Sequence, residues 1–395
     1  MRDQMGPDLR ETTLGQVLMR RSTRTVENSQ LLSVTAERGV ILQEQSGRRD
    51  SSSSDKSLYL QVKSGDIVYN TMRMWQGVSG LSSHDGIVSP AYTVCTPAPD
   101  VNPNYLSRVL KHPGMIASFY RASQGLVSDT WNLRYAELAR IPVILPPIAE
   151  QRRIVEVLDG IDDQIFHERE SKLKEETTRR AVITDSLADE RHPRVAVRSL
   201  LLEPPRNGYS PKEVEEWTGL LALGLGCLTP SGFQARQLKC VPVEGAGNNR
   251  SLLTDGDLLV SRANTRELVG LAGVYRDIGS PCIYPDLMMR LRPRHNLHSE
   301  VLELGLRLPE IRRRIQGFSQ GTSESMVKIT GEMIGDLKVP VPGQEDQESL
   351  LKAMNALRVK FERHTAVLDK LQSTKRALMD DLLTCRVRVP AKSGV

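Results

Sequence analysis

Apolar residues follow the spacing of a helical seam in two long stretches that contain no proline. In the first stretch, residues 148–191, the apolar positions step by four, three and four residues. The second stretch, residues 344–386, keeps steps of four and three for longer, with His364 and Lys375 as its polar positions. This spacing is typical of a coiled coil and predicts two helices, each about 60 Å long at 1.5 Å per residue, that pack as an antiparallel pair. The seam consists of Ile154, Leu158, Ile161, Ile165, Leu350, Met354, Leu357, Phe361, Leu368 and Leu371.

Short β-like runs alternate with turn clusters before the first of these stretches. The runs are residues 58–62, 66–70 and 91–95, and serines 51–54 are the largest turn cluster between them. This alternation predicts a mixed α and β domain. The same kind of pattern restarts at His192 and ends where the second stretch begins.

An internal repeat relates the two halves of the chain. Residues 138–151 align with residues 334–347 at an offset of 196, and Gln124-Gly125 match Gln320-Gly321 at the same offset. Further upstream, Gly65-Asp66 resembles Gly256-Asp257 at an offset of about 191. A period near half the chain indicates two copies of a whole domain. We therefore expect an α+β fold with a pseudo-twofold internal repeat: domains at 1–147 and 192–343, long helices at 148–191 and 344–386, and a tail at 387–395.

Composition limits the compartment and the class of partner. The formal net charge of +5, with 26% charged residues, permits a nucleic-acid partner without indicating a polybasic surface. The five cysteines have no paired spacing, which argues against disulfides or a zinc site and for a reducing compartment. Residues 1–10 lack the apolar core of a secretory signal, and the longest apolar run, residues 220–228, is too short to span a bilayer. We expect a cytoplasmic protein without a membrane partner.

Motifs for catalysis are not found in the sequence. The two proline pairs, 146–147 and 204–205, stand outside the context of a base-flipping methylase loop. The Gly-x-Gly at 224–226 is a weak nucleotide signal, and no Gly-x4-Gly-Lys phosphate loop occurs. The seven histidines lack metal-ligand spacing. We therefore assign no catalytic residue and no metal ligand.

Polar and basic residues gather beside turns at matched places in the two halves. Arginine, glutamine and asparagine fit the edges of guanine and adenine in two-point contacts, so these clusters suit DNA. Solvated surface charge is the alternative interpretation for any single residue. The candidate contacts are Arg48, Arg49, Lys63, Asn70, Arg73, Trp75, Gln76, Arg121, Gln124 and Arg134 in the first half, and Ser261, Arg262, Asn264, Thr265, Arg266, Ser319, Gln320 and Lys328 in the second. The run Arg312 to Arg314 suits phosphates better than bases, with an exposed helix face as the alternative interpretation.

Several segments resemble the specificity subunits of type I restriction-modification systems. These are PPIAEQRRIVEVLDGIDDQI, its echo VPVPGQEDQESLLKAMNALRVKF and the terminal KRALMDDLLTCRVRV. In the two mixed domains, GDIVYNTMRMWQGVSG and DGDLLVSRANTRELVG are similar to segments of that family's target recognition domains. The second copy departs from the first, with Pro340-Val341-Pro342 in place of the proline pair and Asp346 in place of Glu150.

The resemblance implies a non-catalytic subunit that reads an asymmetric, bipartite DNA target through its two domains. Its expected partners are double-stranded DNA, two copies of a methylation subunit and a restriction (translocase) subunit. The subunit itself is expected to hold no cofactor; S-adenosylmethionine, ATP and Mg²⁺ belong to the partners of an adenine-methylating, ATP-dependent nuclease complex. Two other interpretations stay open: a stand-alone DNA-binding or scaffold protein of a methylation-only or other defence system, and a degenerate DNA methyltransferase.

Overall fold

The computed structural model describes residues 8–24, 29–47, 49, 52–53, 55–125, 131–243, 250–318 and 326–389. The chain forms two compact units. The first contains Met1–Arg169 together with Ala366–Val395, and the second contains Glu170–Thr365. Both boundaries between the units fall inside the two long helices, α5 (Ile148–Ala188) and α10 (Gln344–Leu383).

The first unit is built on an antiparallel sheet with strand order β2-β9-β6-β7. Its strands are β2 (Leu18–Arg21), β9 (Tyr92–Pro97), β6 (Ile67–Asn70) and β7 (Ser79–Leu81). Three antiparallel pairs accompany the sheet: β1 (Arg10–Thr13) with β10 (Pro142–Leu145), β3 (Leu32–Thr35) with β4 (Gly39–Leu42), and β5 (Leu60–Val62) with β8 (Gly86–Val88).

Helices cover the sheet of the first unit and carry much of its core. They are α1 (Leu14–Val17), α2 (Pro103–Leu110), α3 (Pro113–Ala122) and α4 (Tyr135–Leu138), with 3-10 turns η2 (Gln43–Ser46) and η3 (Met74–Gln76). Helix α2 begins with proline after Asn102, whose side chain accepts a hydrogen bond from the Tyr105 backbone N–H, as an N-cap does. The core includes Leu14, Tyr69 and Phe119, and Leu158 of α5 joins it.

The second unit contains a four-stranded antiparallel sheet with strand order β12-β21-β17-β19. Its strands are β12 (Arg206–Asn207), β21 (Met288–Leu291), β17 (Leu258–Ser261) and β19 (Ala272–Val274). A three-stranded sheet joins β16 (Leu238–Cys240), β13 (Leu221–Leu223) and β20 (Cys282–Ile283). The remaining pairs are β11 (Arg194–Ala196) with β23 (Lys338–Pro340), β14 (Leu228–Thr229) with β15 (Gly232–Phe233), and β18 (Ala263–Asn264) with β22 (Val327–Lys328).

The helices of the second unit match those of the first. They are α6 (Val197–Leu200), α7 (Ser299–Arg307), α8 (Pro309–Phe318) and α9 (Gly331–Gly335), with a 3-10 turn η5 (Leu225–Cys227). Helices α3 and α8 both begin with proline, at positions 196 residues apart. The turns before β6 and β17 contain Gly65 with φ 91° and Gly256 with φ 90°, a left-handed conformation that glycine adopts easily. The fold confirms the expected α+β class with an internal repeat.

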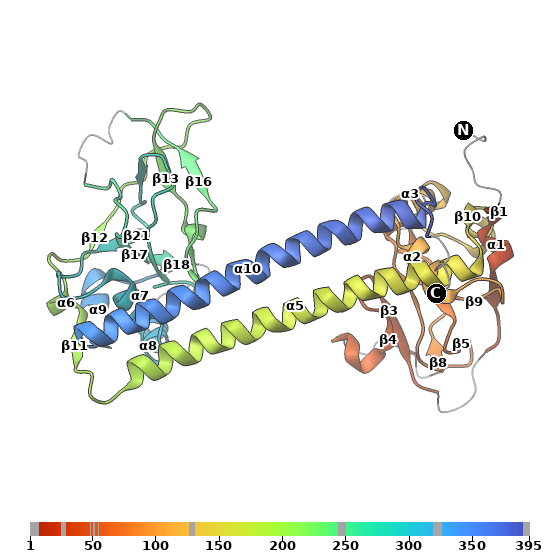
Figure 1. Ribbon diagram of the computed structural model, residues 1–395, viewed down its shortest axis with the longest axis horizontal. Helices are drawn as coiled ribbons and strands as arrows, with labels where there is room; N and C mark the ends of the chain where they lie inside the picture. Colours follow the sequence, from red (N-terminus) through yellow and green to blue (C-terminus); the bar gives the residue numbers. More distant parts are fainter. Residues whose placement is uncertain are drawn as a thin grey trace, which may run out of the picture. The chain divides into compact units, whose positions relative to one another are not determined.

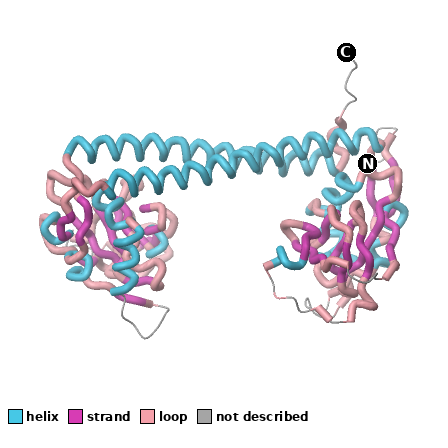
Figure 2. The backbone as a smooth tube through the Cα atoms, turned by 90° about the horizontal axis from the view of Figure 1, so that it is seen from below, coloured by secondary structure: helices cyan, strands magenta, loops and turns pink. Residues whose placement is uncertain are grey.

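Helices α5 and α10 pair in each unit, as Figures 1 and 2 show. In the first unit, Leu158 near the start of α5 shares an apolar cluster with Leu382 near the end of α10. In the second unit, Ile183 near the end of α5 shares a cluster with Leu350 near the start of α10. The two helices therefore run antiparallel. The seam is buried at Ile154, Leu158, Ile165, Leu350, Met354 and Leu368 and partly buried at Ile161, Leu357, Phe361 and Leu371.

Both long helices end earlier than the sequence pattern indicates. Helix α5 ends at Ala188 rather than at Arg191, because the Asp189 carboxylate accepts a hydrogen bond from the Arg191 backbone N–H (2.9 Å) and turns the chain. Helix α10 ends at Leu383 rather than at residue 386, because Cys385 has the left-handed φ of 58°. Within the described ranges, no helix combines the length and apolarity needed to cross a membrane.

Candidate nucleic-acid interface

The first candidate for contact with bases is the loop between β6 and β7, residues 71–78, which is called the first reading loop. The Asn70 side-chain oxygen accepts a hydrogen bond from the Met72 backbone N–H (3.0 Å), which turns the chain out of the sheet. Met74 is fully buried and anchors the 3-10 turn η3, so Arg73 and Gln76 on either side of it stay exposed. The fold thus presents these two side chains to solvent, whereas the Asn70 oxygen already shapes the loop.

Three aromatic rings form a cluster beside this loop. Trp75 lies edge-on to Trp131, with 5.2 Å between ring centroids, and Tyr120 lies 4.7 Å from Trp131. Tyr120 remains 51% exposed. Of these three rings, only Trp75 is among the predicted contacts, although Tyr120 is adjacent to Arg121 and Trp131 lies between Gln124 and Arg134. Partly exposed aromatic rings beside arginine and glutamine side chains form a surface suited to stacking and apolar contact with bases.

The segment after α3 returns to the same surface. The backbones of Gln124 and Asn132 exchange two hydrogen bonds, of 3.2 and 2.9 Å, and the Leu133 N–H donates to the Thr71 carbonyl (2.9 Å). These bonds join the segment to the loop after β6. Of the predicted contacts in the first domain, the fold therefore brings together Asn70, Arg73, Trp75, Gln76, Arg121, Gln124 and Arg134.

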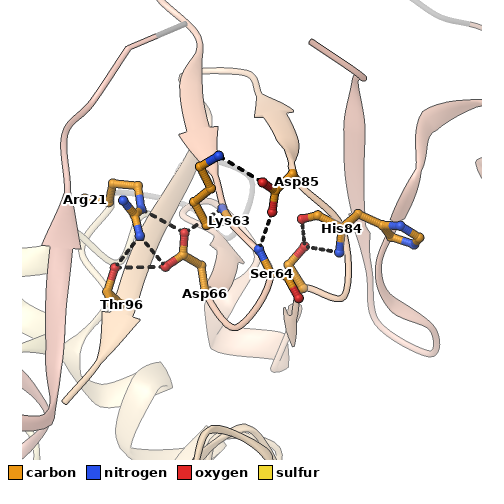
Figure 3. A network of polar contacts seen from close by, with 8 residues as sticks. Arg21, Lys63, Ser64, Asp66, His84, Asp85 and Thr96 are labelled. Carbon is orange, nitrogen blue, oxygen red and sulfur yellow. Dashed lines mark hydrogen bonds and ion pairs between the residues drawn. The ribbon is translucent and has the colours of Figure 1, made fainter. Parts of the chain in front are cut away.

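Lys63 is held in a separate polar network, shown in Figure 3. The buried Asp66 carboxylate accepts hydrogen bonds from Arg21 (2.8 and 2.9 Å) and from the Lys63 backbone N–H (2.8 Å). The Lys63 ammonium pairs with exposed Asp85 (2.9 Å), and this hydrogen bond lowers the pKa of the Asp85 carboxyl. The charge of Lys63 therefore already faces a carboxylate. Arg49 is exposed, and Arg48 lies outside the described residues.

The second candidate for contact with bases is the segment between β17 and β19, residues 262–271, which is called the second reading loop. Asn264 accepts a hydrogen bond from the Thr265 backbone N–H (2.9 Å), and the Thr265 and Arg266 side chains are exposed. Strand β18 pairs Ala263 with Lys328, which places exposed Lys328 beside the loop. The Arg262 guanidinium is only partly exposed and lies 3.5 Å from the Asp286 carbonyl oxygen. Ser319 and Gln320 lie outside the described residues.

One expectation for the second domain is wrong, and one residue of the arginine run is held by the fold. Ser261 is 1% exposed, and its hydroxyl points to the Ala263 carbonyl, so it shapes the loop and does not reach a ligand surface. Arg312 donates to the carbonyl oxygens of Val269 (2.8 Å) and Glu267 (2.9 Å), which ties α8 to the second reading loop. A phosphate contact by the run Arg312 to Arg314 stays a prediction. Burial lowers the pKa of Arg312.

Candidate metal ligands and cysteine thiols occur across the residues that the structure describes. Among the described residues, no group of three or more His, Cys, Asp and Glu side chains is placed to hold a metal ion. All five cysteines are free thiols, and burial raises the pKa of Cys95 and of Cys282 to about 12. Burial with a raised pKa is typical of structural cysteines rather than of reactive ones.

Comparisons with known proteins agree with the fold. No protein-family model matches the chain. The specificity subunit of the type I restriction enzyme EcoKI from Escherichia coli (strain K12) is 26% identical over 247 residues, which cover 57% of this chain and 52% of that protein. The chain thus spans about half the length of the curated relative that it matches.

Two solved structures align over nearly the whole chain. One comes from work on complex assembly and conformational transition of the type I restriction-modification system, with a TM-score of 0.62, 16% identity and coverage of 97% of this chain and 100% of that one. The other is the type I restriction-modification S subunit from M. genitalium, with a TM-score of 0.55, 12% identity and 97% coverage of each chain. The chain has the fold of type I specificity subunits, and the curated match confirms the resemblance in sequence.

Proposed function

We propose that this protein is the DNA-binding specificity subunit of a type I restriction-modification complex and reads an asymmetric, bipartite target. The observation that carries the proposal is a pair of reading loops at matched positions of a repeated domain, with different side chains in each. Arg73, Trp75 and Gln76 in the first domain stand where Arg266 and its neighbours stand in the second. Different side chains select different base edges, so each domain would specify its own half-site.

In the proposed assembly the chain contributes recognition and no catalysis. Two copies of a methylation subunit would dock on the repeated surfaces, since a repeat offers the same patch twice. Those subunits would supply the S-adenosylmethionine site for adenine methylation, and a restriction (translocase) subunit would supply the ATP and Mg²⁺ sites for cleavage. The location of this assembly is proposed to be the cytoplasm.

The length of α5 and α10 is proposed to set the unread gap between the two half-sites. Inserting one heptad after His167 and one after Arg363 keeps the seam in register and adds about 10 Å to each helix. The gap should then grow by about three base pairs of B-DNA, subject to the twist of the duplex, while both half-site sequences stay the same. Sequencing of methylated sites in cells checks this; an unchanged gap with full activity would mean that the helices do not set the spacing.

Two tests separate this proposal from its alternatives. Co-purification with a methylation subunit distinguishes a type I specificity subunit from a stand-alone DNA-binding or scaffold protein. Methyl transfer to DNA by the purified chain alone would instead favour a degenerate methyltransferase. We expect stable co-purification, binding to duplex DNA by the chain, and no methyl transfer without the partner.

A further inference from the structure

The two copies of the domain contain cavities at matched places. The cavity of the first unit has a volume of about 610 Å³ and that of the second about 740 Å³. In the first unit, the cavity lies between the residues that follow α1 and the start of α4. In the second unit, it lies between the residues that follow α6 and the start of α9. Arg134, the N-cap of α4, corresponds at the 196-residue offset to Thr330, the N-cap of α9.

The cavity of the first unit is positively charged. Arg20, Arg24 and Arg134 line it, all three are exposed, and no acidic residue contributes to its wall. No ion pair involves any of these arginines within the part of the chain that the structure describes. Three guanidinium groups thus line one depression, and an anion with several oxygen acceptors could bind them through charge-assisted hydrogen bonds.

The lining of the matched cavity in the second unit contains more acidic than basic side chains. Glu203 stands at the position of Arg20, and Glu332 at that of Ala136, while Asp336 also lines the wall. The single arginine of this cavity, Arg198, already pairs with Asp336 at 2.8 Å. Glu203 also pairs with Arg206 (2.8 Å) and Arg292 (3.6 Å). The two linings therefore differ in charge, and in the second unit an anion would meet three carboxylates beside one arginine.

The basic cavity, lined by Arg20, Arg24 and Arg134, adjoins the first reading loop. Thr71 and Asn132 form part of its wall, and these residues lie where the loop after β6 is hydrogen-bonded to the segment after α3. An anion held in the cavity would thus lie next to Asn70 and the bases that this loop is proposed to read. In duplex DNA, the anion that accompanies the bases is the backbone phosphate.

We propose that Arg20, Arg24 and Arg134 form a phosphate-backbone site that anchors DNA beside the first half-site, and that the second domain has no such anchor at the matched position. This inference rests on the proposed function, because it requires that the first domain bind DNA. If so, the first domain contributes more than the second to the salt-dependent part of the affinity for DNA.

The test compares the full chain with its Arg20→Gln/Arg24→Gln/Arg134→Gln variant in binding a fluorescent duplex at several salt concentrations. The control variant Arg152→Gln/Arg169→Gln/Arg376→Gln removes the same charge from exposed positions of the same unit. We expect the cavity variant to bind at least about ten-fold more weakly at low salt. The logarithm of its binding constant should also fall less steeply with the logarithm of the salt concentration. The magnitude of this slope should be smaller by about 1 to 3, because each phosphate contact contributes about 0.9 to it. The control variant should retain most of the affinity and the slope.

Three outcomes would overturn the inference. The first is a cavity variant with the slope and affinity of the control, and the second is a variant that loses preference between base sequences, which would make the arginines base contacts. The third is stabilisation of the wild-type chain, but not the variant, by inorganic phosphate together with unchanged duplex binding; the cavity would then hold a free anion. A wild-type chain that binds no duplex would contradict the proposed function itself. Single Arg→Gln variants provide the same comparison if the triple variant does not fold.

Discussion

The first turns of the two long helices contain the same residue, a buried glutamine, at matched positions. The acidic residue just before the glutamine differs between the two copies. In the first copy, Gln151 is buried and accepts a hydrogen bond from the Asn102 backbone N–H (2.8 Å) while donating to the Pro146 carbonyl (2.8 Å). In the second copy, Gln347 does the same with the His298 N–H (3.1 Å) and the Pro342 carbonyl (3.0 Å). Each glutamine thus links the start of a long helix to the residue that precedes α2 or α7.

The acidic residues behave differently. Glu150 has a side chain only 5% exposed, and it binds the Arg388 guanidinium (2.6 Å) and the Val389 backbone N–H (2.9 Å) of the C-terminal segment. The matched Asp346 is exposed. The segment after α5 continues into strand β11, which pairs with β23, whereas the segment after α10 has no following strand among the described residues. A side-chain contact, the ion pair of Glu150 with Arg388 that is called the brace below, thus holds the segment that no following strand holds.

Removing either glutamine should cause the largest loss of stability. We expect Gln151→Ala and Gln347→Ala each to lower the free energy of unfolding of their own unit by about 2 to 4 kcal/mol, because buried hydrogen bonds are lost and backbone groups are left without partners. Denaturant unfolding followed by tryptophan fluorescence separates the units, since Trp75 and Trp131 belong to the first and Trp217 to the second. Exposed Gln344→Ala is the matched control, with an expected change within about 0.5 kcal/mol.

Glu150→Gln and Asp346→Asn should separate the two copies. We expect Glu150→Gln to cost about 1 to 3 kcal/mol in the first unit, less than the about 3 to 5 typical of a fully buried pair, because Arg388 remains 34% exposed. Asp346→Asn should change the second unit by less than about 0.5 kcal/mol. The same unfolding measurement applies, and equal losses in both units would refute the idea that only the first copy needs the brace.

A smaller effect should appear as the pH is lowered. Hydrogen bonding by Arg388 lowers the pKa of Glu150 in the folded chain. A carboxyl group with a depressed pKa contributes stability that is present above its unfolded value, about 4.3, and is lost as the pH falls through the folded value. The stability difference between wild type and Glu150→Gln should therefore be constant near neutral pH and shrink below about pH 4. A difference that does not change with pH would mean that the charge of Glu150 is not what holds the C-terminal segment.

The sequence predicted those features that depend on local spacing. The seam residues of α5 and α10 follow from the periodicity of apolar positions. The repeat then related one half to the other. The repeat includes the segment with Glu150 and Gln151, but the residues that bind these two side chains lie far away along the chain, and local spacing does not indicate them.

The sequence was least informative about which polar side chains are free. Ser261 and Arg312 have the composition of ligand contacts, yet one is buried and the other binds backbone carbonyls of the neighbouring loop. Lys63 is paired with Asp85, which comes from a separate turn. Tyr120 and Trp131 join Trp75 only after the chain folds. Burial and long-range pairing decide these cases, and a linear pattern of residue types contains neither.

The central claim is that the two domains read different half-sites, and sequencing of methylated DNA tests it most directly. The chain would be expressed with its methylation subunit in cells without other methylases, as wild type, as Arg73→Ala/Trp75→Ala/Gln76→Ala and as Arg262→Ala/Asn264→Ala/Arg266→Ala. We predict an asymmetric bipartite site for wild type, with each triple variant changing or losing one half and leaving the other intact. Each lost two-point base contact should cost about 1 to 3 kcal/mol. If both triples weakened methylation at every site equally, with no change in either half-site sequence, the account would be contradicted.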